Sequence, residues 1–411
     1  MTTLIRADRL IDGTGSAVVE NAVLVIEEGK VVGVYPSQAP DSVVSPDAEI
    51  LDFPGCTIMP GMIDTHVHLN MPGDGTLLET VVREPEGVLV ATSAFTAQRA
   101  LAAGITTVRD LGASGTTVIN LQRALELGHG VGPRILSCGQ PITITGGHTW
   151  YFGGEADGID GLRLKVRQMA KIGANFIKVM GSGGGTVNTL SWRPAYNREE
   201  MRALADEAHA LDRKIAVHCL CADSIDYAID AGVDQIEHAG FITDSKGNQK
   251  YVPEVAEKLG KSGIPVTSTL AVGGSVVEIM TAKKDRTPTE DAFLERWIRM
   301  LDDNLSQFRK LRDAGVSFVA GTDAGWRFTP FEGLPLELEL MHRGGMTTME
   351  AIVSGTGFAA KVIGIDDKVG TLTKGLAADV IVVGGNPLDN LGALRDLKLV
   401  IQGGKVRSRA Q

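Results

Sequence analysis

The chain has 411 residues, enough for one large barrel and a smaller accessory domain, and its 43% hydrophobic and 22% charged content is ordinary for a globular enzyme. A formal net charge of −10 without a basic block argues against nucleic acid as a partner, although a metal site would still admit an anionic small substrate. The four scattered cysteines give no disulfide framework, and neither a signal peptide nor an apolar run long enough to cross a bilayer is visible. We therefore expect a cytoplasmic homo-oligomer that acts on a small molecule and has no membrane partner.

Both ends of the chain contain short apolar strands around glycine turns. Residues 22–34 read as a hairpin, and residues 378–387 and 399–406 repeat the pattern near the other end. Neither end alone has enough strands to bury a core. We predict one small β-sandwich domain assembled from residues 1–58 and 366–411.

Residues 59–365 alternate between strand and helix patterns, which predicts a (β/α)₈ barrel in an α/β protein. No Gly-x-Gly-x-x-Gly dinucleotide fingerprint follows the first strand. The predicted strands are Gly61–His66, Ile105–Asp110, Arg134–Cys138, Phe176–Met180, Ile215–His218, Gln235–His238, Pro265–Thr269 and Ser317–Thr322. The predicted helices include Ser93–Ala103, Arg198–Leu211, Ala222–Ala231 and Asp291–Ala314.

Four histidines and an aspartate lie at the ends of predicted strands. His66 and His68 end the first barrel strand as a His-x-His pair, and alternate strand residues share a face, so both imidazoles can converge on one ion. His218, His238 and Asp323 close the fifth, sixth and eighth strands, at the face where barrel enzymes place their chemistry. Hydrogen-bonded core packing would explain each histidine alone. Four of only eight histidines at strand ends predict a site for Zn²⁺ or a similar ion.

Lys178 interrupts the apolar strand Phe176–Met180, where desolvation of an ammonium group is costly. One interpretation is an interior ion pair with Asp110 or Asp323. The other is that burial lowers the pKa of Lys178 from about 10.4, so that the neutral amine captures CO₂ and becomes N6-carboxylysine. We favour this carbamate, because its two oxygens and single negative charge suit it to bridging two metal ions.

The combined ligand set, flanked by terminal β-strands, resembles the binuclear-metal type of the amidohydrolase superfamily over nearly the whole chain. This ligand set consists of His66, His68, Lys178, His218, His238 and Asp323. The resemblance implies two divalent ions, with Zn²⁺ the expected metal. It places the more buried ion on His66, His68 and Asp323 and the exposed ion on His218 and His238, with carbamylated Lys178 between them.

Mononuclear deaminases of the same superfamily share the His-x-His pair and the final aspartate but lack the bridging lysine. They typically add a glutamate soon after the fifth-strand histidine, whereas CLCADS follows His218 here. This departure favours amide hydrolysis over deamination. In the expected mechanism a metal-bridging hydroxide attacks a polarised carbonyl, and Asp323 accepts the water proton and delivers it to the leaving nitrogen.

His148 follows the third strand within Thr-Gly-Gly-His, and we expect it to donate to the substrate carbonyl oxygen; a surface loop histidine is the alternative. The segment resembles the dipeptidase branch related to imidazolonepropionase, which includes Xaa-Pro dipeptidases and arginine/lysine carboxypeptidases. That resemblance implies that Tyr196 contacts the substrate's C-terminal carboxylate, although packing at a helix start explains this tyrosine nearly as well. Arg193 is a second candidate for the carboxylate, with a solvated arginine as the plainer interpretation.

Aromatic residues gather in predicted loops at the barrel mouth, where we expect them to line an apolar pocket. They are Trp150, Tyr151, Phe152, Trp192, Trp326 and Phe328. The leading prediction is hydrolysis of a C–N bond in a small amide, a dipeptide or an N-acyl amino acid. The same site acting on a urea, carbamate or aryl amide is the runner-up, followed by a mononuclear-metal deaminase. A catalytically silent assembly protein is the alternative from a different class.

Overall fold

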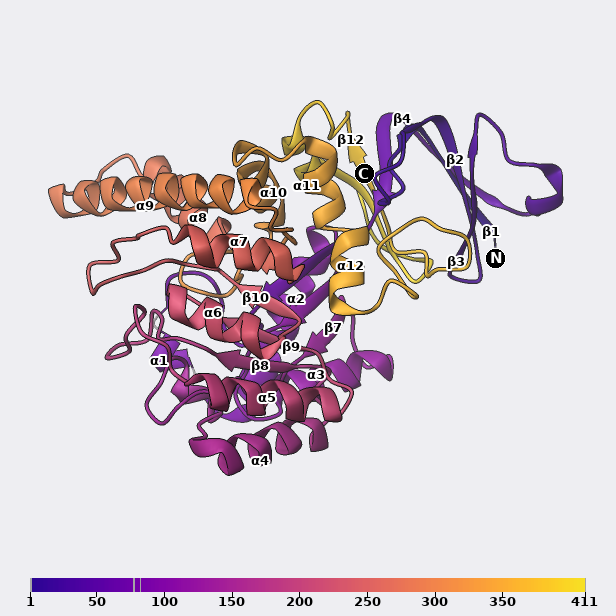
Figure 1. Cartoon of the computed structure of the whole chain (residues 1–411). Helices are drawn as coiled ribbons and strands as arrows, with labels where there is room; N and C mark the ends of the chain where they lie inside the picture. Colours follow the sequence, from indigo (N-terminus) through magenta and orange to yellow (C-terminus); the bar gives the residue numbers. More distant parts are fainter. Residues whose placement is uncertain (1, 77, 82, 411) are drawn as a thin grey trace.

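The computed structural model describes residues 2–76, 78–81 and 83–410, which form a terminal β-sheet and a central α/β unit. In Figure 1 the indigo and yellow strands of the two chain ends lie side by side, next to the helices of the central unit. Among the described residues, no helix is both long enough and apolar enough to cross a membrane.

The terminal sheet has seven strands in the order β14-β13-β12-β4-β1-β2-β3. They are β1 (Thr2–Leu10), β2 (Val19–Glu27), β3 (Lys30–Pro36), β4 (Glu49–Pro60), β12 (Val380–Gly384), β13 (Leu397–Gln402) and β14 (Lys405–Arg409). Strand β4 joins the two ends of the chain, since it pairs in parallel with β1 and antiparallel with β12. Ile5, Leu24, Val382 and Leu399 belong to one apolar cluster, so side chains from both ends share a single core.

The central strands are parallel and close into a barrel. They are β5 (Met62–Val67), β6 (Ile105–Asp110), β7 (Arg134–Ser137), β8 (Ile177–Met180), β9 (Ile215–His218), β10 (Gln235–Glu237) and β11 (Val266–Thr267). A parallel bridge from Ile142 to Val179 connects the β5–β7 sheet to β8. On the other side, bridges from Val266 to Phe318 and from Ala324 to Val67 return through residues 317–324 to β5. The predicted α/β fold class, a barrel with a small β-sandwich domain from both termini, is confirmed, and the terminal strands belong to one seven-stranded sheet.

The eighth barrel strand is less regular than predicted. Ser317–Thr322 contributes only the isolated bridge at Phe318. One reason is that the backbone N–H of Thr322 donates to the Asp64 side chain at 3.0 Å instead of to a neighbouring strand. Strands β6 and β9, by contrast, have the predicted bounds.

Helices connect and cover the strands. They are α1 (Leu78–Val81), α2 (Glu86–Ala102), α3 (Thr117–Glu126), α4 (Gly158–Lys171), α5 (Arg198–Ala210), α6 (Ala222–Ala231), α7 (Pro253–Ser262), α8 (Ala271–Ala282), α9 (Pro288–Asp313), α10 (Leu334–Arg343), α11 (Thr348–Ser354) and α12 (Gly357–Ile363). Helix α9 begins three residues before its predicted start, because Thr287 and Glu290 form a capping box and Pro288 occupies the first turn.

Candidate metal centre

All six predicted ligands line a single cavity of about 440 Å³ at the mouth of the barrel. They are His66, His68, Lys178, His218, His238 and Asp323. Each lies within or just after a barrel strand or, for Asp323, after the strand-like segment that closes the barrel. The closed barrel therefore brings together side chains that are as much as 257 positions apart in sequence (66 to 323).

Asp323 lies between the two histidines of the His-x-His pair. Its Oδ1 atom is 3.4 Å from Nε2 of His66 and 3.3 Å from Nε2 of His68. One ligand atom each from His66, His238 and Asp323 lie within 4.8 Å of one another, close enough to share an ion. This cluster contains members of both predicted ligand sets, so the two sets adjoin.

Two of these residues have unusual backbone conformations. His238 has φ +69° and Asp323 has φ +61°, both in the left-handed region that non-glycine residues rarely occupy. Such conformations cost on the order of 1–3 kcal/mol and concentrate at functional sites. Here they turn the side chains at the ends of the strands into the cavity.

Hydrogen bonds to ring nitrogens hold the remaining histidines. Nδ1 of His238 is 2.8 Å from Oγ1 of Thr269, and Nδ1 of His148 is 2.8 Å from Oγ1 of Thr186. The ring centroids of His148 and His218 are 4.7 Å apart. His148 is therefore a buried wall of the cavity beside the ligand cluster, and not the surface loop histidine of the alternative interpretation.

Burial keeps most of the imidazoles neutral. It lowers the pKa of His238 to about 4 and that of His148 to about 3, and it holds the pKa of His66 and His218 well below the usual range. Burial opposes ionisation of Asp323, but the neighbouring histidines bring the pKa of this carboxyl to about 2. At neutral pH the cluster thus offers free imidazole lone pairs beside a carboxylate, a donor set that suits Zn²⁺.

The amine of Lys178 has no partner. The side chain is buried, and Nζ makes neither a hydrogen bond nor an ion pair with any described residue. Burial lowers its pKa from the usual 10.5. The interior ion pair with Asp110 or Asp323 is therefore absent from the described structure. Oδ1 of Asp323 also lacks a hydrogen bond, so two buried polar atoms of the cluster are left for a group such as a metal ion.

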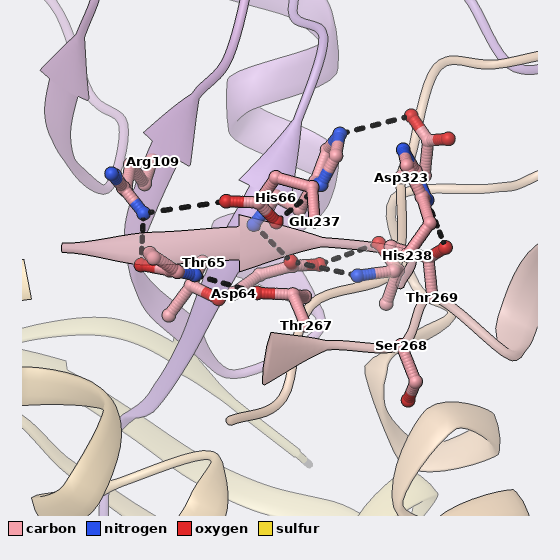
Figure 2. Close-up of polar contacts among 12 residues, drawn as sticks. Asp64, Thr65, His66, Arg109, Glu237, His238, Thr267, Ser268, Thr269 and Asp323 are labelled. Carbon is pink, nitrogen blue, oxygen red and sulfur yellow. Dashed lines mark hydrogen bonds and ion pairs between the residues drawn. The ribbon is translucent and has the colours of Figure 1, made fainter. Parts of the chain in front are cut away.

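Sequence reasoning missed a charged pair beneath the cluster. Oε2 of Glu237 is 2.9 Å from Nδ1 of His66, and Oε1 is 3.7 Å from Nη1 of Arg109 (Figure 2). Glu237 and Arg109 are fully buried, at 0% and 2% exposure. The available signal was a charged residue within each of two short strands, Arg109 in β6 and Glu237 in β10, and every residue of both strands is buried.

Two predicted substrate contacts lie elsewhere. Tyr196 is buried in the main apolar core, and its hydroxyl donates to the carbonyl of Ala156 at 3.1 Å. Arg193 is exposed, and neither of these two described residues lines the cavity. The packing interpretation fits Tyr196, because its hydroxyl already has a hydrogen-bond partner. The solvated interpretation fits Arg193, because this residue is exposed to water.

Helix α9 forms a cavity wall that the sequence did not reveal. One face of this helix lines the cavity, including Phe293, Arg296, Trp297 and Met300, which recur at helical spacing. Of the six predicted aromatic residues, Trp192 and Trp326 line the cavity. The wall is therefore partly aromatic, as expected, but much of it comes from α9.

A (β/α)₈ barrel with a histidine, lysine and aspartate cluster at its mouth defines a class of metal-dependent hydrolases. The sequence matches the Amidohydrolase family over residues 57–407, and the chain belongs to this family. It is 30% identical to ochratoxinase of Aspergillus niger, covering 98% of this chain and 86% of that protein.

Solved structures agree with this assignment. A Xaa-Pro dipeptidase with bound methionine superposes with a TM-score of 0.83 and 28% identity, covering 99% of both chains. A prolidase complexed with N-methylphosphonate-L-proline gives a TM-score of 0.84 and 26% identity, covering 100% of both chains. The predictions of an enzyme and of metal-dependent hydrolysis of a C–N bond in a small substrate are confirmed.

Proposed function

We propose that the enzyme hydrolyses the amide bond of a dipeptide or an N-acyl amino acid, using two divalent ions, Zn²⁺ as the expected metal. His66, His68 and Asp323 would hold one ion, and His218 and His238 the other. The observation that carries the proposal is the unpartnered, buried amine of Lys178 in the same cavity as these ligands.

Lys178 would supply the bridge between the ions. Its neutral amine adds to CO₂, forming an N–C bond and releasing one proton, and gives a carbamate with two oxygen ligands. Burial supports this reaction, because the lowered pKa leaves the nitrogen lone pair available. The modified residue would be N6-carboxylysine.

When bound, the ions polarise the substrate carbonyl and lower the pKa of a water molecule, so that hydroxide is available near neutral pH. Asp323 accepts the water proton at a carboxylate oxygen, since the pKa of about 2 keeps this group ionised. It then delivers the proton to the leaving nitrogen, which an amide requires because an amide anion is a very poor leaving group.

His148 would stabilise the charge that develops on the carbonyl oxygen. Thr186 Oγ1 accepts the backbone N–H of Thr149 at 3.0 Å, so its own hydroxyl proton can be donated to Nδ1 of His148. The ring proton then resides on Nε2, which makes His148 a hydrogen-bond donor in the cavity wall.

The substrate carboxylate would meet Arg296 and Arg327 instead of Tyr196 and Arg193. Both arginines line the cavity, and no carboxylate of the described residues pairs with either one. Arginine suits carboxylate recognition because its guanidinium group can donate two parallel hydrogen bonds.

A second candidate substrate is an aryl amide, urea or carbamate at the same site. The aromatic cavity residues Trp192, Phe293, Trp297 and Trp326 favour it, since they offer an apolar wall. The relative from Aspergillus niger is an ochratoxinase. A cytoplasmic location and a homo-oligomeric state stay predictions, the second testable by light scattering.

The test is metal analysis followed by a substrate screen. About two ions per chain are expected, whereas one ion would favour the mononuclear arrangement. Dipeptides and N-acyl amino acids should be compared with aryl amides and ureas by detecting the released amine. If ammonia appeared from aminated heterocycles while no amide was cut, the proposal would be wrong.

A further inference from the structure

Nε2 of His66 faces Asp323, and the other ring nitrogen, Nδ1, lies 2.9 Å from Oε2 of Glu237. Glu237 is the only described carboxylate within 4 Å of this Nδ1 atom. His68 differs, because its Nδ1 is 3.1 Å from the backbone carbonyl of Gly112. The two histidines of one pair are thus oriented by acceptors of different charge.

The negative charge of Glu237 is balanced within the barrel. Nη1 of Arg109 lies 3.7 Å from Oε1 of Glu237 and donates to Oε1 of Gln235 at 2.5 Å. The guanidinium carbon is 4.0 Å from the ring centroid of Phe176, which covers it on one face. Barrel interiors are filled mainly by branched apolar residues, so a buried ion pair here needs an explanation.

The network continues to the second predicted ligand set. Nε2 of Gln235 donates to Oγ1 of Thr267 at 2.6 Å, and the carbonyl of Thr267 accepts the N–H of His238 at 2.7 Å. Glu237 also directly precedes His238 in the chain. Figure 2 shows that this network connects His66 on β5 with the His238 turn after β10.

We propose that Glu237, with Arg109 as its counter-ion, is a positioning residue that orients His66 for metal binding and fixes it relative to His238. The inference rests on the proposed function, because it assigns both histidines to ions. The carboxylate accepts a hydrogen bond from Nδ1–H of His66, so the lone pair of Nε2 faces the cavity. The same hydrogen bond makes Nε2 a stronger ligand for a metal ion. Through the adjacent peptide and Thr267, the same network sets the position of His238.

The first experiment measures metal affinity and not activity. Apo wild type and Glu237→Gln are titrated with Zn²⁺ against a competing chelator, and the visible spectrum is recorded after loading with Co²⁺. We expect binding to weaken by about ten- to hundredfold and the Co²⁺ spectrum to change. Glu337→Gln is the matched control, since Glu337 is an equally buried carboxylate that contacts Ser268 and Ala271 and no histidine.

The second experiment separates positioning from charge balance. Glu237→Gln leaves Arg109 buried without its partner and is expected to destabilise the fold, whereas removing both charges restores stability. The double variant Glu237→Gln/Arg109→Met should therefore fold like the wild type but still bind Zn²⁺ about tenfold or more weakly.

Wild-type affinity in the double variant would overturn the inference, because the pair would then serve folding alone. Unchanged affinity in a folded Glu237→Gln protein would overturn it as well. A wild-type enzyme that binds no divalent ion would instead refute the proposed function, so the two failures are distinguishable.

Discussion

The imidazole of His148 lies directly over Gly184, where a Cβ atom would come within 2.5 Å of ring Nε2. This contact explains why one residue of the glycine-rich segment after Lys178 is a glycine. Any larger side chain at position 184 would collide with the His148 ring in the cavity wall.

Gly184→Ala should therefore displace the imidazole of His148 and lower kcat by about tenfold or more. The reason is that the displaced ring can no longer donate a hydrogen bond to the substrate carbonyl oxygen. Metal content should stay at the wild-type level, since His148 is not an assigned ligand. Steady-state kinetics and metal analysis check both expectations. Gly161→Ala is the control, because a Cβ on this glycine of helix α4 meets open space. An equal loss of kcat in both variants would contradict the assignment.

Asp323→Asn should reduce kcat by roughly 10²- to 10⁴-fold, because the amide can neither accept the water proton nor return it to nitrogen. Most of the metal should remain bound, since the other predicted ligands are intact. Metal analysis of the same preparation supplies the control. Near-normal turnover would refute the proton-transfer role.

Lys178→Met should bind metal less well, and it should lose the carbamate signal that ¹³C-labelled bicarbonate gives in the wild type by NMR. Without metal, the variant should be at least as stable as the wild type in thermal unfolding, because a buried amine without a partner opposes folding. Full occupancy by two ions in the variant would rule out the bridging role.

Arg296→Gln should raise KM for an N-acyl amino acid by about five- to tenfold and leave kcat nearly unchanged, as expected for a partly exposed charged contact. The effect should vanish for the analogue that lacks the carboxylate. Arg299→Gln is the control, since Arg299 on the same helix already faces Glu295 at 4.0 Å. Equal effects on acid and analogue would argue against carboxylate recognition.

Glu337→Gln should change the dependence of stability on pH. Burial raises the pKa of Glu337 from its usual 4.5 to about 8, so the folded protein prefers the protonated carboxyl. The stability that this preference contributes is fully present below pH 4.5 and is lost as pH rises through about 8. The glutamine variant mimics the protonated group, so it should unfold less readily than the wild type near pH 9. Urea unfolding of the metal-free proteins at pH 5 and pH 9 tests this prediction. If the free energy of unfolding changed equally with pH in both proteins, Glu337 would not be the group responsible.

Local patterns predicted most of the barrel, because short stretches with apolar residues between helical segments indicated strands such as β6 and β9, and a 3.6-residue period indicated helix α6. The same patterns missed features that depend on the closed barrel. The pairing of Glu237 with His66 joins residues 171 positions apart, and no local rule connects them. Local patterns also did not indicate where the Tyr196 side chain packs: this tyrosine precedes helix α5, as the sequence suggested, and its ring belongs to the main apolar core and not to the cavity lining.

The pairing of β4 with β12 also determines when the molecule can be completed. Val382 on β12 lies opposite Ile58 on β4, so more than 300 residues separate the partners of this ladder. During synthesis, the outer edge of β4 has no neighbour until the last strands leave the ribosome, and an open strand edge invites pairing with other chains. We therefore expect that truncation before β12 would leave this edge of β4 unpaired and would favour aggregation over an active smaller enzyme.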